Sequence, residues 1–215
     1  MTKRSDLKSV AGVPSQSDPI YLHTARRRNR RIGSLDADAL KFDSRICHYC
    51  NTTRTQPHDM AWQQLSESLR FRDPPLIAGQ FIRCNSIFPY DTRGAMRDVN
   101  LYLVKLFGGK IMDGNITSLD IKPFSEAILK NRVHPNVYAA FGPAPEEDDN
   151  LFASASDVQI AVLNGKCAYA VWIQHIGNLW VRVMYAAEGE KRRGLVVQTP
   201  GPSCRLQRRL LFAIT

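Results

Sequence analysis

The stretch VQIAVLNGKCAYAVWIQHIGNLWVRVMYA, residues 158–186, decides the fold. Only Asn164-Gly165 and Gly177-Asn178 interrupt three runs that are rich in β-branched and aromatic residues. Asn and Gly tolerate the positive φ angles that two-residue hairpin turns require. The pattern therefore predicts an antiparallel meander, with two further strands downstream. The five expected strands span residues 158–163, 167–176, 179–186, 194–199 and 206–214.

The middle of the chain has helical periodicity instead. Apolar residues recur three or four positions apart in residues 59–72 and 92–107, and Gly108-Gly109 predicts the end of the second helix. A shorter helix is expected from about residue 120, and a strand over residues 76–88. Helices followed by a run of strands indicate an α+β fold, with helices packed on an antiparallel sheet of about five strands.

Residues 1–45 lack this periodicity. They are rich in Ser, Asp and Arg, and Pro14 and Pro19 interrupt any long element. We expect a largely disordered basic arm, followed by a single α+β domain over residues 46–215.

The positive charge is concentrated at the two ends of the chain. The net charge is +9, and residues 1–58 carry eleven Lys and Arg against five Asp and Glu. Residues 187–215 carry six against two, whereas residues 59–186 are close to neutral. This excess of positive charge predicts an acidic partner. We interpret the partner as nucleic acid. The alternatives are an anionic membrane surface and an acidic protein.

The densest basic segment is residues 26–31, with five arginines in six positions. A guanidinium stays charged and offers a planar fork of donors that matches phosphate oxygens, so such a segment can follow a nucleic-acid backbone without reading sequence. A nuclear import signal or a solvated charge run has the same composition. The predicted nucleic-acid interface comprises Arg26, Arg27, Arg28, Arg30, Arg31, Arg192, Arg193, Arg208 and Arg209.

Cys47-His48-Tyr49-Cys50 has the spacing by which one turn offers two thiolates to zinc, and His58 follows eight residues later. Cys47, Cys50 and His58 are the candidate metal ligands. No second pair at comparable spacing completes a zinc signature, so we predict no cofactor and keep zinc as the alternative. The odd number of cysteines and the absence of a charged-then-apolar leader favour an intracellular, reducing location, the nucleus included.

Motifs for catalysis are absent from the sequence. It contains no Gly-x-Ser-x-Gly elbow, no phosphate-binding glycine loop and no His-Glu-x-x-His, so we predict that the protein is not an enzyme. Tyr169, Trp172, Trp180 and Tyr185 lie on adjacent expected strands, where core packing is commoner than stacking on bases. No apolar run approaches the roughly 18 residues that a membrane span needs.

The arginine-rich arm ahead of a compact body resembles the coat proteins of small RNA viruses, whose arms neutralise packaged genome. The order of a basic N-terminus, a strand, helices and late antiparallel strands resembles the matrix proteins of rhabdoviruses. These resemblances imply a non-enzymatic structural protein of the virion, matrix or coat, which binds RNA or a nucleocapsid and forms homo-oligomers. The first alternative is a cellular zinc-containing RNA-binding protein of ribosomal type, and the second is a nucleic-acid-processing enzyme.

Overall fold

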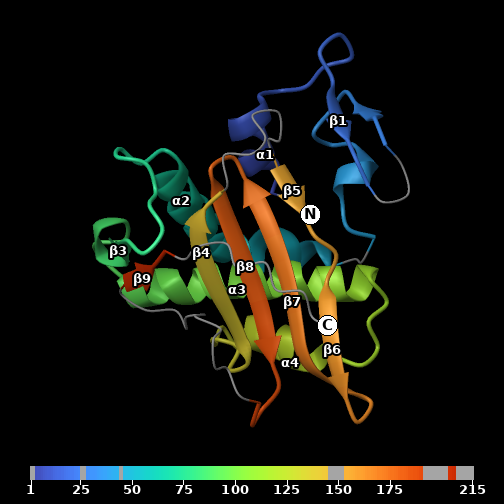
Figure 1. Ribbon diagram of the computed structural model, residues 1–215, viewed down its shortest axis with the longest axis vertical. Helices are drawn as coiled ribbons and strands as arrows, with labels where there is room; N and C mark the ends of the chain where they lie inside the picture. Colours follow the sequence, from blue (N-terminus) through green and yellow to red (C-terminus); the bar gives the residue numbers. More distant parts are fainter. Residues whose placement is uncertain (1–2, 25–27, 44–45, 145–152, 191–202, 207–215) are drawn as a thin grey trace.

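The computed structural model describes residues 3–24, 28–43, 46–144, 153–190 and 203–206. At its centre lies a five-stranded antiparallel sheet in the order β4-β8-β7-β5, with β6 also paired to β7 (Figure 1). The predicted α+β fold is confirmed. The strands of this sheet are β4 (Val137–Pro143), β5 (Ala153–Ala155), β6 (Gln159–Leu163), β7 (Lys166–Ile176) and β8 (Leu179–Ala186).

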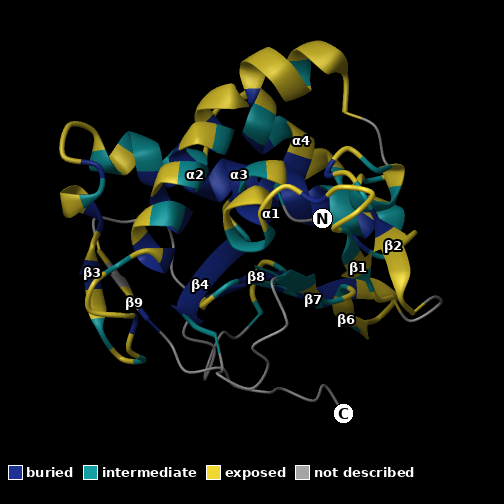
Figure 2. Cartoon of the chain, turned by 90° about the horizontal axis from the view of Figure 1, so that it is seen from above, coloured by how far each residue is buried: buried dark blue, intermediate teal, exposed yellow. Residues whose placement is uncertain are grey.

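Helices cover one face of this sheet (Figure 2). The core between the layers is built around aromatic side chains, and Trp62 stacks on Tyr102 with ring centroids 5.1 Å apart. Trp172 enters the same core from β7, which agrees with the prediction that the strand aromatics pack. The helices are α1 (Arg4–Ala11), α2 (Gln56–Arg70), α3 (Thr92–Asp113) and α4 (Lys122–Leu129).

The two tight turns of the meander are those expected. Asn164 and Gly165 both have positive φ, at 52° and 75°, and connect β6 to β7. Gly177, with φ of 54°, begins the turn between β7 and β8. Because both turns have two residues, local sequence sets the register of β7 with β8 and that of β6 with β7 next to the turn, and the β6–β7 register then shifts between Ala161 and Val162.

Several strand predictions need correction. Within residues 76–88 only β3 (Phe81–Arg83) is a strand, and Cys84–Ser86 form a 3-10 turn. β3 pairs with β9 (Ser203–Arg205) in a separate two-stranded sheet. The expected strand at residues 194–199 and nearly all of the one at 206–214 lie outside the described residues. Two strands of the main sheet, β4 and β5, lie outside the predicted strand ranges.

Gly108-Gly109 does not end α3, which continues to Asp113. A Cβ at residue 108 would lie 3.4 Å from Ile121 Cδ1, and one at residue 109 would lie 3.6 Å from the Phe42 ring. Both distances are ordinary van der Waals contacts, so neither position requires glycine for steric reasons, and the largely buried helix tolerates the low helix propensity of glycine.

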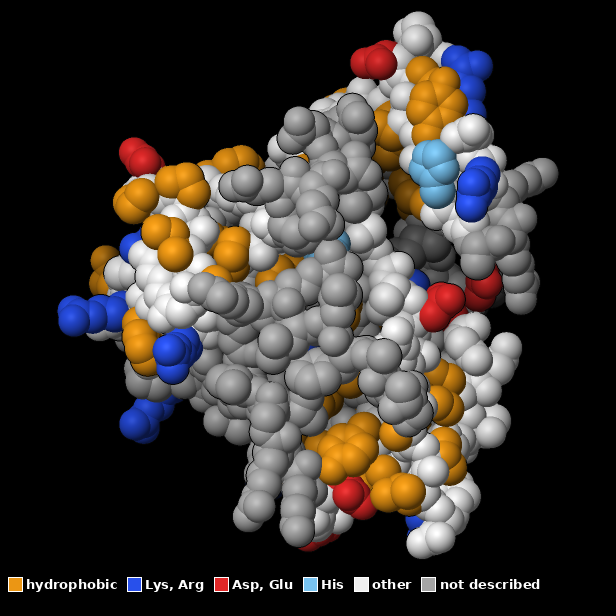
Figure 3. Space-filling model, in the orientation of Figure 1, with side chains coloured by type: hydrophobic (Ala, Val, Ile, Leu, Met, Phe, Trp, Pro, Cys, Tyr) orange, Lys and Arg blue, Asp and Glu red, His pale blue; other side chains and the backbone are white. Residues whose placement is uncertain are grey.

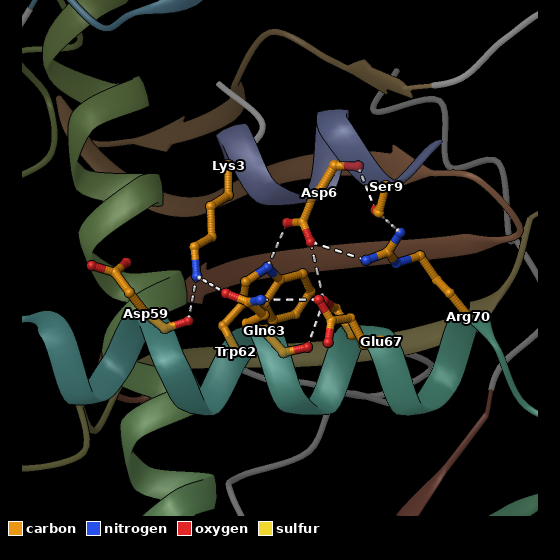
Figure 4. Close-up of polar contacts among 9 residues, drawn as sticks. Lys3, Asp6, Ser9, Asp59, Trp62, Gln63, Glu67 and Arg70 are labelled. Carbon is orange, nitrogen blue, oxygen red and sulfur yellow. Dashed lines mark hydrogen bonds and ion pairs between the residues drawn. The ribbon is translucent and has the colours of Figure 1, made fainter. Parts of the chain in front are cut away.

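The N-terminal segment also differs from the expectation of a disordered arm. Its described residues include α1, then β1 (Ile20–Leu22) and β2 (Arg30–Ile32), which pair as an antiparallel hairpin. The N-terminal segment is ordered by tertiary contacts, because buried polar side chains dock α1 on α2 (Figure 4).

The centre of this docking is the buried carboxylate of Asp6. It accepts hydrogen bonds from Trp62 Nε1 at 2.8 Å, Ser66 Oγ at 3.1 Å and Arg70 Nη2 at 3.2 Å. Burial raises the pKa of Asp6 above its usual value, and the three donors oppose that shift. Without these donors, desolvation of the carboxylate would disfavour docking of α1.

Candidate nucleic-acid interface

The described part of the basic segment predicted to bind nucleic acid, residues 28–31, lies on the β1–β2 hairpin, near the end of the sheet that carries β5 (Figure 1). Ile20 pairs with Ile32, and Ile32 is buried, which anchors the base of the hairpin. Arg30 and Arg31 on β2 are exposed. Asn29 immediately precedes β2 and has a φ of 54°. Asn adopts this left-handed conformation more readily than most residues.

Three of the nine predicted arginines have described positions. Arg28, Arg30 and Arg31 are exposed on the hairpin, and the guanidinium of Arg31 donates a hydrogen bond to the carbonyl oxygen of Gln16. This contact ties β2 to the preceding loop. The other predicted residues, which lie outside the described ranges, are Arg26, Arg27, Arg192, Arg193, Arg208 and Arg209.

A hollow of about 480 Å³, here called the hairpin groove, lies between this hairpin, β5 and the C-terminal part of α3. Tyr21, His23 and Arg28 line it from the hairpin, and Lys110 lines it from α3. In Figure 3, histidine and basic side chains gather over the hairpin at the upper right. Asp157 supplies one acidic group against Arg28 and Lys110, and most of the remaining lining is apolar.

Tyr21 and Lys110 line the groove although neither belongs to the predicted interface. The Tyr21 side chain is 58% exposed beside the arginines, so its ring is accessible to a ligand. Lys110 lies 82 positions after Arg28 in the chain, and only the packing of the hairpin near α3 brings them to one groove. The one local sequence signal for this part of the interface is Tyr21, an aromatic residue five positions before the arginine cluster begins.

The candidate zinc ligands Cys47 and Cys50 lie together on one turn. The backbone N–H of Cys50 donates to Cys47 Sγ at 3.2 Å, and Arg54 Nη1 lies 3.7 Å from Cys50 Sγ. Their mutual thiol hydrogen bond lowers the pKa of Cys47 and raises that of Cys50.

His58, the third candidate ligand, is buried on α2. Its Nε2 lies 3.6 Å from Asp98 Oδ1, and burial lowers the pKa of the imidazole. Among the described residues, no three His, Cys, Asp or Glu side chains form a group that could hold a metal ion. The zinc hypothesis stays a prediction.

Comparisons with protein families, with curated proteins and with solved structures found no match to this chain. Within the described ranges, no helix combines the length and the apolar character that crossing a membrane requires. Functional inference for this protein therefore depends on the geometry of its own side chains.

Proposed function

We propose that this protein binds single-stranded RNA through the β1–β2 hairpin and the hairpin groove. The observation that carries the proposal is the exposure of Arg28, Arg30 and Arg31 on one hairpin, beside a groove that Lys110 also lines. Their guanidinium groups contact phosphates, and release of counterions from the RNA supplies most of the affinity.

The groove favours a single strand over a duplex. The exposed ring of Tyr21 offers a face on which an unpaired base stacks, and such stacking tolerates any base. Arg28 and Lys110 line the same groove and neutralise the adjoining phosphates. Binding is therefore strongly salt-dependent and weakly sequence-dependent.

In this proposal the protein is a non-enzymatic structural protein of the coat or matrix type. Each subunit binds RNA weakly, and an array of subunits on one strand binds it firmly because every further contact is intramolecular. Light scattering with and without RNA, across a salt series, tests this part. RNA-dependent particles that dissociate in salt are expected, whereas a chain that stays monomeric with RNA at low salt contradicts assembly.

The RNA-binding part is tested by fluorescence anisotropy with a labelled oligouridine over a range of salt concentrations. The variant Arg28→Gln/Arg30→Gln/Arg31→Gln removes three charges from the hairpin. Its matched control is Arg83→Gln/Arg93→Gln/Arg132→Gln, which removes three exposed charges outside the hairpin and the groove.

The hairpin variant should bind more weakly, and the slope of log K against log salt should decrease by about 2, since each phosphate contact on a single strand contributes about 0.7. The control variant should retain most of the slope. Equal losses in the two variants would show that only net charge matters and would refute the hairpin site. A loss confined to one RNA sequence would refute binding through the backbone.

A further inference from the structure

A second cavity, of about 180 Å³, lies between the start of the N-terminal helix, α2 and α3. We call it the lysine pocket. Its walls are largely apolar, with Leu40, Phe42 and Ile46 on one side and Leu106 of α3 on another. Its basic side chains are Lys3, Lys41 and Lys105, and its one acidic side chain is Asp59.

Lys105 and Asp59 neutralise one another. Lys105 Nζ lies 2.7 Å and 2.9 Å from the two carboxylate oxygens of Asp59, and donates to Thr55 Oγ1 at 3.1 Å. These contacts use the three N–H groups of the Lys105 ammonium. The carboxylate of Asp59, the acidic group of the pocket, is therefore already paired with Lys105.

Lys3 has a different environment. Its ammonium donates to the backbone oxygen of Asp59 at 2.6 Å and to Gln63 Oε1 at 3.2 Å, and both acceptors are neutral (Figure 4). Burial lowers the pKa of Lys3, the charges of Asp59, Asp6 and Glu67 oppose that shift, and the charge of Lys105 adds to it. The Lys3 ammonium is therefore partly desolvated, and neither of its two hydrogen-bond acceptors carries a charge.

Lys41 adds positive charge to the same lining. Its ammonium lies 2.8 Å from Asp38 Oδ1, and both side chains are largely exposed. An exposed pair of this kind is weak and exchanges readily with other ions. The lining as a whole attracts an anion, while its apolar walls favour a hydrocarbon group.

We propose that the lysine pocket binds a small organic monoanion, a carboxylate that carries a short aromatic or aliphatic group. The carboxylate contacts the ammonium of Lys3, and the hydrocarbon group packs against Phe42 and Leu106. The volume suits this class, because apolar cavities of about 150 Å³ admit benzene. An inorganic anion would leave the apolar walls without a partner.

The test uses benzoate as the probe, with titration calorimetry on the full chain. Saturable 1:1 binding of benzoate is expected, and at least tenfold weaker binding of benzyl alcohol, which has the ring without the charge. Phosphate and sulfate should also bind at least tenfold more weakly. Equal binding of these ions would overturn the role of the apolar walls, and no saturable benzoate binding would overturn the site.

The charge of Lys3 is tested by Lys3→Gln, with Lys8→Gln as the control, since Lys3 is the N-cap of α1 and Lys8 is an exposed residue of that helix. We expect a loss of affinity of tenfold or more in Lys3→Gln and no change in Lys8→Gln. Equal losses in the two variants would overturn the assignment of Lys3.

Lys3 also helps to dock α1, so a second pair of variants tests the pocket without that contact. Gly109 lines the pocket, whereas a Cβ at Gly108 meets Ile121 and Phe124 instead. Both Gly→Ala changes favour the helix, so both variants should fold. Gly109→Ala should weaken benzoate binding several-fold and Gly108→Ala should leave it unchanged. The reverse order would place the ligand elsewhere.

Discussion

The indole N–H of Trp62 donates a hydrogen bond to the carboxylate of Asp6 at 2.8 Å, across 56 positions of the chain. Both side chains are fully buried. Trp62 in turn stacks on Tyr102 of α3, so one carboxylate connects α1 to the aromatic centre of the core. The N-terminal segment that leads to the basic hairpin is thereby anchored to the body of the protein.

Asp6→Ala should destabilise the protein by about 3–5 kcal/mol, because it leaves the buried guanidinium of Arg70 without its carboxylate partner. Urea denaturation measures the effect. The matched control is Asp36→Ala, which breaks an exposed pair with Arg4 and should cost less than about 1 kcal/mol. Equal costs in the two variants would contradict a docking role for Asp6.

Gly165→Ala should destabilise the protein by about 1–2 kcal/mol, because residue 165 has φ of 75° and an alanine there is strained. A Cβ would meet nothing within 4 Å, so the backbone alone accounts for the cost. Thermal unfolding measures it. Gly108→Ala makes the same chemical change inside α3 and should be neutral or stabilising, so destabilisation of the same size in both variants would count against the turn argument.

The elements predicted correctly have local causes. The turns at Asn164-Gly165 and Gly177-Asn178 needed residues that accept positive φ, and those residues are visible in the sequence. The start of α3 is similar, since the Asp91 carboxylate accepts a hydrogen bond from the N–H of Gly94 as an N-cap does. Short-range sequence signals of this kind predict the folded conformation correctly because tertiary contacts do not oppose them.

The elements missed have distant causes. The strand β4 has the sequence VYAAFGP, a weak strand signal, and it forms because β8 pairs with it along its whole length. The helix α1 depends on Arg70, which is 64 residues away from Asp6. In the candidate interface, composition identified the arginines, but Lys110 joins them only through the packing near α3.

Among the four cysteines whose side chains the structure describes, Cys47 should be the first to react with iodoacetamide at neutral pH. It is exposed, its pKa is lowered by hydrogen bonding with Cys50, and the thiolate is the reactive form. Cys50 should react more slowly because its pKa is raised, and the buried Cys84 and Cys167 should react only on unfolding. Peptide mass spectrometry over a time course separates these sites, and simultaneous labelling of Cys47 and Cys84 would contradict the description.

His134 should make the protein less stable as the pH falls from about 6.5 to about 4. Its side chain is buried against Phe124, and burial lowers the pKa of the imidazole from 6.5 to about 4. Within this window the unfolded chain binds a proton that the folded chain does not, so stability decreases by at most about 1.4 kcal/mol per pH unit. His58 acts in the same direction, and the comparison with His134→Gln isolates the contribution of residue 134. The advantage of wild type over that variant in urea denaturation should shrink on acidification, and a constant difference would show that His134 titrates normally.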